Sequence, residues 1–72
     1  MYDLQILTEV LRDDYGVFVQ GIDSDGIYIA DSGENFSDLE RYMKEITMIE
    51  DGFAGMQWRV YNADDGFFME IW

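Results

Sequence analysis

The chain has 72 residues, and its sixteen Asp and Glu residues against four Lys and Arg residues give a formal net charge of -12 at pH 7. It contains no Cys and no His, which excludes disulfides, zinc sites of the usual ligand type and the commonest general base in catalysis. Hydrophobic residues make up 49% and aromatic residues 17%, too much apolar material for a disordered acidic tail, so residues 1–72 are expected to fold as a single acidic domain.

Residues 3–14 have the pattern of a helix. Asp3 is placed to cap its first turn, and Gly16 is placed to end it in the left-handed conformation that glycine adopts readily. Its apolar residues fall at helical spacing on one stripe: Leu4, Leu7, Val10 and Leu11. A surface helix with one buried face is therefore expected here.

Two short strands are predicted next, in residues 17–23 and 27–30, joined by the turn Asp-Ser-Asp-Gly. This composition is typical of a type I turn that closes with a left-handed glycine, which gives a three-residue loop. With that loop, one face of the hairpin carries Val17, Val19, Ile27 and Ile29, and the other carries Phe18, Gln20, Ile22 and Tyr28. Because the second face is partly apolar, part of it is expected to be covered.

A second helix is predicted after a polar loop. Two residues compete for its N-cap, because Ser37 with Glu40 forms a capping-box pattern and Asn35 with Asp38 forms the same kind of pair. Gly52 is expected to end this helix. Its apolar residues recur at helical spacing: Leu39, Tyr42, Met43, Ile46 and Ile49.

The last seventeen residues, 56–72, predict a second hairpin around the sequence Asn-Ala-Asp-Asp-Gly. With a four-residue or a two-residue loop, the facing pairs are Trp58 with Ile71, Val60 with Met69, and Arg59 with Glu70. A three-residue loop would instead set Val60 against Glu70, which is a poorer match. The favoured register leaves three aromatic residues, more than solvent contact explains, on an outward face made of Gln57, Arg59, Tyr61, Phe68, Glu70 and Trp72.

The predicted fold class is therefore α+β, in the order helix, hairpin, helix, hairpin. We expect a four-stranded antiparallel sheet with two helices on one face. The longest apolar runs are only a few residues long, so we expect neither a signal peptide nor a membrane span, and a cytoplasmic location follows.

The stretch DSDGIYIADSGE, residues 23–34, resembles a calcium-binding loop by residue count, since Asp23, Asp25, Asp31 and Glu34 fall at four of the ligand positions. The positions that should hold an oxygen ligand and a glycine are instead Ile27 and Tyr28, whose alternation is typical of a strand. A hairpin is the favoured interpretation, and no metal or other cofactor is expected. Catalysis is not expected either, because the hydroxyl side chains have no histidine to activate them.

The acidic residues concentrate in turns and at helix ends. Such a surface repels nucleic acid and anionic membranes, and it attracts basic protein surfaces with fast, salt-sensitive association. The plainer alternative is that acidity only keeps a small protein soluble, although one excess charge in six residues exceeds what solubility requires. The candidate contact acids are Asp13, Asp14, Asp23, Asp25, Asp31, Glu34, Glu50, Asp51, Asp64 and Asp65.

The run Asp-Tyr-Gly-Val-Phe-Val-Gln-Gly-Ile-Asp-Ser, residues 14–24, follows the helix that opens at Asp3. It resembles the start of a family of small acidic phage anti-CRISPR proteins, which inhibit the type II RNA-guided nuclease by occupying the groove that reads the PAM. The resemblance implies that carboxylates imitate PAM DNA and engage the arginines that read guanines. Asp14 is the matched contact candidate and Asp23 a matching turn acid. Past residue 24 the acidic C-terminal helix of that family is missing, so another nuclease complex, a restriction enzyme or a glycosylase is equally compatible with the charge.

The leading hypothesis is a non-catalytic inhibitor from a phage or mobile element, acting in the cytoplasm of the infected bacterial host. Its partner would be a basic surface of a CRISPR effector nuclease or another DNA-binding enzyme, which it blocks as a DNA mimic. The alternative is an antitoxin, immunity-type or structural interaction module that uses an aromatic sheet face for a stable complex or a homodimer. The aromatic residues expected to anchor the contact are Tyr28, Tyr61, Phe68 and Trp72.

Overall fold

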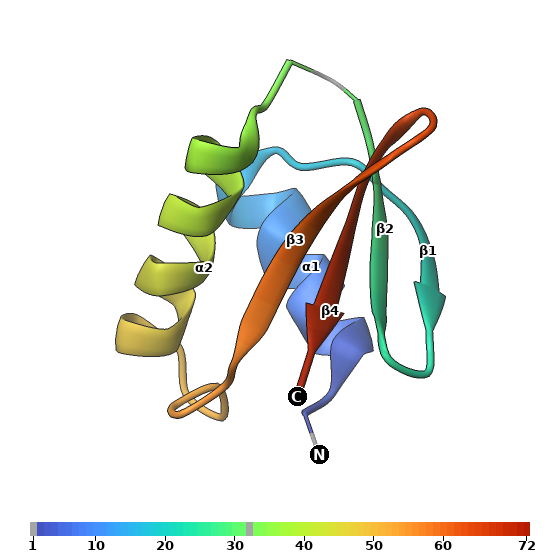
Figure 1. The fold of residues 1–72 in the computed structure, drawn as a ribbon. Coiled ribbons are helices and arrows are strands. Elements are labelled where there is room, and N and C mark those ends of the chain that lie inside the picture. The colour runs from blue at the N-terminus through green and yellow to red at the C-terminus, as the bar shows by residue number, and fades with distance from the viewer. Residues whose placement is uncertain (1, 32) are drawn as a thin grey trace.

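A computed structural model describes residues 2–31 and 33–72 of the protein, and it confirms the predicted α+β class (Figure 1). Two helices and four strands follow one another as helix, hairpin, helix, hairpin. Their bounds are α1 Leu4–Tyr15, β1 Val19–Asp23, β2 Gly26–Ala30, α2 Phe36–Ile49, β3 Trp58–Ala63 and β4 Gly66–Ile71.

The four strands form one antiparallel sheet in the order β1-β2-β4-β3. Each hairpin supplies one central and one edge strand, and the two hairpins meet through β2 and β4. Figure 1 shows α1 behind the strands and α2 beside it, so that both helices pack on the same side of the sheet. The other face of the sheet carries no helix of the described chain.

The hydrophobic core lies between the helices and the covered face of the sheet. Each helix contributes a stripe of buried residues at helical spacing, and the two central strands contribute alternate residues. The buried residues are Leu7, Leu11, Val17, Ile27, Ile29, Leu39, Met43, Ile46, Phe53, Met56, Met69 and Ile71.

The caps of α1 are those that the sequence predicts. The Asp3 carboxylate accepts hydrogen bonds from the backbone N–H groups of Gln5 at 3.0 Å and Ile6 at 3.2 Å. Gly16 follows the helix with φ of 68°, and its N–H donates to the Leu11 carbonyl. The left-handed residue turns the chain back toward the sheet, where β1 begins.

The N-cap of α2 is Asn35, not Ser37. The Asn35 side chain accepts from the Asp38 N–H at 2.9 Å, and the Asp38 carboxylate accepts from the Asn35 N–H at 3.1 Å. The prediction that Gly52 ends this helix is wrong, because the last helical residue is Ile49 and Gly52 lies in the turn beyond it with φ of 90°.

The reciprocal hydrogen bonds at Asn35 predict a measurable contribution to stability. We expect Asn35→Ala to lower the free energy of unfolding by about 1 kcal/mol, because the Asp38 N–H in the first turn of the helix loses the side-chain oxygen that caps it. Urea unfolding followed by circular dichroism measures the difference. Asn62→Ala, an equal truncation at an exposed position of β3, is the matched control and should change stability by less than about 0.5 kcal/mol. Equal losses in the two variants would contradict the assigned cap.

The turn of the first hairpin is tighter than the sequence predicts. Asp23 pairs with Gly26, so the loop contains only Ser24 and Asp25 instead of three residues. The expected left-handed glycine is also wrong, since Gly26 does not have a positive φ. Glycine is required here for space, because a Cβ at position 26 would overlap the carbonyl oxygen of Met69 in β4.

The register of the first hairpin shifts within β1, between Val19 and Gly21. Gly21 faces Tyr28 and Ile22 faces Ile27, so Ile22 lies on the core side. The prediction that Ile22 shares a face with Tyr28 is therefore wrong. Ile22 remains 45% exposed because β1 is an edge strand.

The predicted register of the second hairpin is confirmed. Arg59 faces Glu70 and Val60 faces Met69, and the loop is the two-residue alternative, Asp64–Asp65. The strand begins at Trp58, later than predicted. The residues before it form a loop between α2 and β3 in which Phe53 and Met56 are buried.

Candidate functional site

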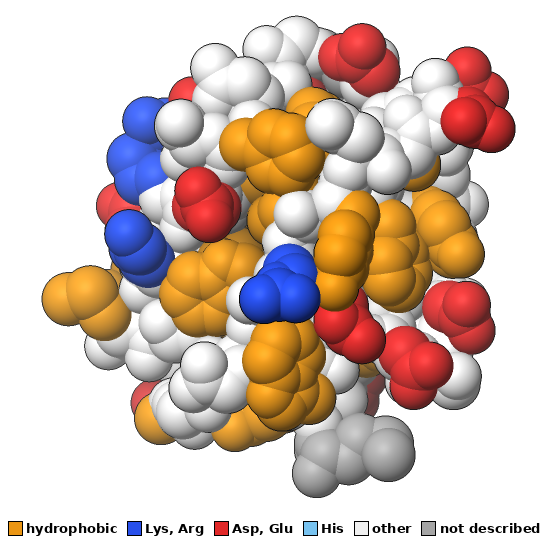
Figure 2. Space-filling view, viewed as in Figure 1, with side chains coloured by type: hydrophobic (Ala, Val, Ile, Leu, Met, Phe, Trp, Pro, Cys, Tyr) orange, Lys and Arg blue, Asp and Glu red, His pale blue; other side chains and the backbone are white. Residues whose placement is uncertain are grey.

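The face of the sheet opposite the helices carries three aromatic side chains in one row across three strands. Phe68 of β4 lies between Tyr28 of β2 and Tyr61 of β3, its direct partners in the sheet. The ring centroids of Tyr28 and Phe68 are 4.7 Å apart, and those of Tyr61 and Phe68 are 6.4 Å apart. Tyr28 is 42% exposed and Tyr61 is 40% exposed. We call these three residues the aromatic row. Figure 2 shows that hydrophobic side chains gather on this face of the molecule.

Next to the aromatic row lies a charged pair. Arg59 of β3 faces Glu70 of β4, and the Tyr61 hydroxyl donates a hydrogen bond to the Glu70 carboxylate at 3.2 Å. The pKa of the Arg59 guanidinium is raised, mainly by its interaction with the Tyr61 hydroxyl and further by Glu70. This pair orients the Tyr61 ring and places one positive charge on an otherwise acidic face.

Acidic residues occupy both ends of the sheet. At one end the Asp31 N–H donates to the Asp65 carbonyl at 3.1 Å, which brings Asp31 beside the turn Asp64–Asp65. At the other end Asp23 and Asp25 belong to the β1–β2 turn. We call these the Asp65 group and the Asp25 group. The six residues of β4 run between them, so they lie about 17 Å apart.

Strand β2 separates the acidic residues whose spacing resembles that of a calcium-binding loop. Ile27 and Tyr28 lie within β2, with Asp23 and Asp25 before it and Asp31 after it. Glu34 is half-buried in the loop that leads to α2. Across residues 2–31 and 33–72, no group of three or more acidic, His or Cys side chains is arranged to hold a metal ion.

The remaining candidate acids lie in the helical layer, away from the aromatic row. Asp13 and Asp14 are in the last turn of α1, and Asp13 pairs with Arg12 at 3.0 Å. Glu50 follows the last residue of α2, and Asp51 follows Glu50. The structure therefore brings five of the ten acids to the ends of the sheet and places these four at the C-terminal ends of the helices.

Two of these four acids, Asp14 and Glu50, act on Tyr15, which packs against Tyr42 with ring centroids 4.8 Å apart. The pKa of Tyr15 is raised, first because burial disfavours the phenolate and then because Glu45, Asp14 and Glu50 repel it. The ends of both helices thus contribute negative potential to one region of the helical layer.

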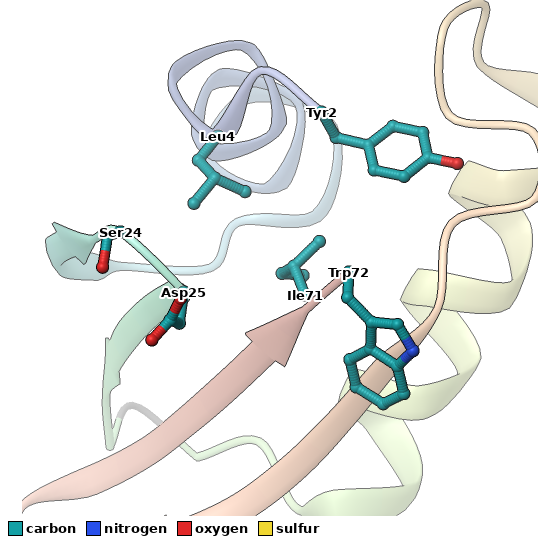
Figure 3. Close-up of a pocket in the computed structure, with 6 residues that line it drawn as sticks. All are labelled: Tyr2, Leu4, Ser24, Asp25, Ile71 and Trp72. Carbon is teal, nitrogen blue, oxygen red and sulfur yellow. The ribbon is translucent and has the colours of Figure 1, made fainter.

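The fourth candidate aromatic, Trp72, stands apart from the aromatic row at the end of β4. Its backbone N–H and carbonyl both pair with Gln57, and the residue is 58% exposed. Beside it is a hollow of about 320 Å³, which we call the Trp72 pocket, lined by Tyr2, Leu4, Ser24, Asp25, Ile71 and Trp72 (Figure 3). A second, more open hollow of about 460 Å³ is lined by Asp25, Arg59, Glu70, Ile71 and Trp72. This site is the main feature that sequence reasoning missed, because its lining residues are far apart in the sequence.

Similarity to known proteins does not indicate a function for this site. Comparisons with family models, curated proteins and solved structures find no match. Neither helix of the described chain is long and apolar enough to cross a bilayer.

The charge distribution predicts that salt stabilises the isolated domain. Among the described residues only two ion pairs form, Arg12 with Asp13 and Arg41 with Asp38, so most of the acids repel one another without compensation. We expect about 0.5 M NaCl to raise the melting temperature by about 5 °C relative to low salt, because screening weakens this repulsion.

Differential scanning calorimetry at a series of NaCl concentrations measures this shift. The variant Asp64→Asn/Asp65→Asn is the control, because it removes two charges at an exposed turn and should reduce the salt dependence. A melting temperature that is flat or falls with salt would contradict uncompensated repulsion.

Proposed function

We propose that the protein is a non-catalytic inhibitor that covers a basic, nucleic-acid-binding surface of another protein with its open sheet face. The observation that carries this proposal is the layout of that face, in which the exposed aromatic row lies between the Asp65 group and the Asp25 group. Protein interfaces commonly have a desolvated aromatic centre and a polar rim. Here the rim is acidic, so the complementary partner surface is basic.

The aromatic row would supply the affinity. Aromatic side chains lose little conformational entropy on binding and bury a large apolar area. Tyr28 and Tyr61 are already held by contact with Phe68, and Tyr61 also by its hydrogen bond to Glu70. A centre that is ordered before binding costs less entropy on association.

The acidic groups would supply steering and selectivity. A net charge of -12 attracts basic surfaces and repels acidic ones, which speeds association with the correct class of partner. The separation of about 17 Å between the two groups equals the rise of about five nucleotides along the axis of a DNA duplex. The face is thus compatible with a groove that otherwise holds a nucleic-acid backbone.

The first partner to test is the type II RNA-guided nuclease, because residues 14–24 resemble the start of an inhibitor family of that enzyme. Asp14, the matched contact of that family, lies in the helical layer, whereas Asp23 belongs to the Asp25 group on the sheet. If the nuclease is the target, we therefore expect this protein to engage it through the sheet instead of through Asp14.

A pull-down at two salt concentrations tests the proposal. The tagged protein is incubated with bacterial lysate, and separately with the purified nuclease, in about 50 mM and about 500 mM NaCl. We expect a partner with a basic surface that is retained at low salt and lost at high salt, and a loss of DNA binding by that partner in a gel-shift assay. A partner without a basic surface, or one whose DNA binding is unaffected, would contradict the proposal.

A second function is supported by the aromatic row alone. Three contiguous aromatic side chains on an uncovered sheet face also suit a stable complex with an apolar partner, as in an antitoxin or immunity protein, or a homodimer. Such a complex should barely respond to salt. The two arms of the pull-down, with sedimentation of the isolated protein, distinguish these functions from the first.

A further inference from the structure

We infer that two copies of this protein pair through the outer edge of β3, so that their two sheets join into one continuous sheet. This inference goes beyond the proposed function and does not depend on it, because the pairing uses the edge of the sheet and leaves the open face free. It also differs from a homodimer formed through the aromatic row. The observations that carry it are the unpaired backbone of β3, its unbroken register and the neutral charge around it.

Alternate residues of β3 present their backbone groups to the outer edge of the sheet. Gln57 and Trp72 exchange both backbone hydrogen bonds, at 2.9 and 3.0 Å. Hydrogen-bonded and non-hydrogen-bonded pairs alternate along an antiparallel ladder, so Arg59 and Tyr61 also bond to β4. The N–H and carbonyl groups of the residues between them point away from β4. These outward residues are Trp58, Val60 and Asn62.

The outward groups have no hydrogen-bond partner within the part of the chain that the structure describes. Backbone groups without an internal partner must bond to water or to another chain, and an edge strand offers them as a template for a further strand. The residues themselves are half-buried at Trp58 and Val60 and exposed at Asn62, so α2 does not close this edge.

The two edges of the sheet differ in their protection against pairing. The outer edge of β1 is interrupted by the register shift between Val19 and Gly21, and the strand ends at the charged residue Asp23. Bulges and charges are devices by which natural sheets prevent edge pairing. In contrast, β3 has six residues in unbroken register with β4, and its one charged residue is Arg59. The edge that a further strand can join is therefore that of β3.

The surroundings of β3 are the electrically neutral part of a strongly acidic molecule. The helix that packs against β3 is α2. Residues 36–49 and 58–63 together contain three acidic and three basic residues, so their net charge is zero, whereas the whole chain has -12. Figure 2 shows Lys and Arg side chains over α2 and β3. A second copy, which is as acidic as the first, therefore meets little repulsion along this edge. The six charged residues are Asp38, Glu40, Arg41, Lys44, Glu45 and Arg59.

The outward residues of β3 are complementary to themselves. When Val60 faces Val60 of the second copy across a twofold axis, Trp58 faces Asn62 of the second copy. All the outward groups are then paired, which gives about six hydrogen bonds. A shift by one residue would place outward groups opposite residues that already bond to β4, and a shift by two would leave Trp58 or Asn62 without a partner in the facing strand.

The same register brings complementary side chains together on the open face. Arg59 faces Tyr61 of the second copy in a non-hydrogen-bonded pair, in which side chains approach most closely. Tyr61 is 40% exposed and is held by its hydrogen bond to Glu70, and its neighbour Phe68 lies on one side of it only. Its free side can therefore receive the guanidinium in a cation–π contact. The twofold axis places both open faces on the same side, so the dimer presents two aromatic rows side by side.

Amide hydrogen exchange at two protein concentrations tests the pairing without a variant. We expect the Trp58, Val60 and Asn62 amides to be protected about fivefold more at about 1 mM protein than at about 0.05 mM, in about 500 mM NaCl. The Tyr61 amide bonds to β4 and should be protected equally at both concentrations. The Ile22 amide, which points outward from the other edge of the sheet, is the control and should not change.

Sedimentation equilibrium tests the mass and its dependence on salt. The chain has a mass of 8.5 kDa, and we expect the measured mass to approach twice this value as the protein concentration rises. Because two acidic molecules repel each other over long range, the dissociation constant should fall about tenfold between about 50 mM and about 500 mM NaCl. The complex with a basic partner should respond to salt in the opposite direction, so the two interactions are distinguishable.

Two variants of one residue test whether the β3 edge forms the contact. Asn62 is exposed and its N–H points outward, so proline there removes a donor that the isolated domain does not use. We expect Asn62→Pro to weaken the dimer at least about thirtyfold, and Asn62→Ala, which keeps the N–H, to change it less than about twofold. Circular dichroism confirms that both variants are folded.

Three results would overturn the inference: a monomer mass at about 1 mM protein in both salt concentrations, equal exchange protection of outward and inward amides, or a dimer that is kept in Asn62→Pro and lost in Phe68→Ala. The first would leave the β3 edge to a strand of a different protein, and the last would place the contact on the open face. A failure of the edge pairing leaves the proposed function standing, because the salt-dependent pull-down tests the open face and not the edge.

Discussion

Replacing Gly26 by alanine is expected to lower the free energy of unfolding by about 3 kcal/mol or more. A Cβ at this position would overlap the Met69 carbonyl oxygen and would approach the Phe68 ring to 2.9 Å and the Glu70 Cα to 3.0 Å. Two of these neighbours are backbone atoms of a central strand, so they cannot move without breaking the pairing of β2 with β4. Domains of this size have only a few kcal/mol of stability, so the variant should be largely unfolded.

The control for this prediction is Gly21→Ala in the neighbouring strand β1. A Cβ at Gly21 would meet no atom within 4 Å, and its backbone is not left-handed. This variant should be as stable as the parent protein or up to about 1 kcal/mol more stable, because alanine restricts the unfolded chain. Urea titrations followed by tryptophan fluorescence compare the two. Similar stabilities of Gly26→Ala and Gly21→Ala would show that β4 does not approach β2 as closely as described.

Replacing Phe68 by alanine is expected to weaken the complex with the basic partner about thirtyfold, while the domain remains folded. Phe68 is the middle residue of the aromatic row, and its removal takes away the ring that both Tyr28 and Tyr61 pack against. The loss therefore includes the preorganisation of the two neighbouring rings as well as the contact area of Phe68 itself.

Phe18→Ala is the matched control, since it truncates a phenylalanine that is 62% exposed before the start of β1. We expect this variant to bind within about threefold of the parent protein. Isothermal titration calorimetry at one fixed salt concentration compares the dissociation constants, and circular dichroism confirms that both variants are folded. A Phe68→Ala variant that binds as tightly as Phe18→Ala would place the contact away from the open sheet face.

The elements that the sequence predicts well are those whose signals are local. Helix α1 has its cap at Asp3, its stop at Gly16 and its apolar stripe all within a few residues of one another, and each is found as predicted. The register of the second hairpin is likewise set by adjacent residues, because only a two-residue or four-residue loop matches Arg59 with Glu70.

The features that the sequence does not predict depend on distant neighbours. The turn at Asp23 has the composition of a three-residue loop, but β4 lies so close to Gly26 that the strand continues through the glycine. The shift at Gly21 follows, because the apolar residues of β1 must still face the core. The burial of Phe53 and Met56 is similar, since a loop carries no periodic signal.

The candidate site also combines features with a local sequence signal and features that depend on distant parts of the chain. That Tyr61 and Phe68 share an outward face is predicted from one hairpin, and Tyr28 is assigned to the outward face of the other. That these three rings form one row requires β2 to lie beside β4, and the sequence does not specify the strand order. The Trp72 pocket depends on still more distant contacts, because Tyr2, Asp25 and Ile71 come from the beginning, middle and end of the chain.

The pairing of β2 with β4 also determines how the molecule holds together. Each half of the chain is a helix followed by a hairpin, and each hairpin alone would leave the long edge of a central strand unpaired. The loop between Ala30 and Phe36 connects the two halves along the chain. The pairing of β2 with β4, in which Ile27 faces Met69, packs the two halves against each other. The contact face and the folding of the domain therefore both depend on the pairing of β2 with β4, so the aromatic row exists only after the two halves of the chain have paired.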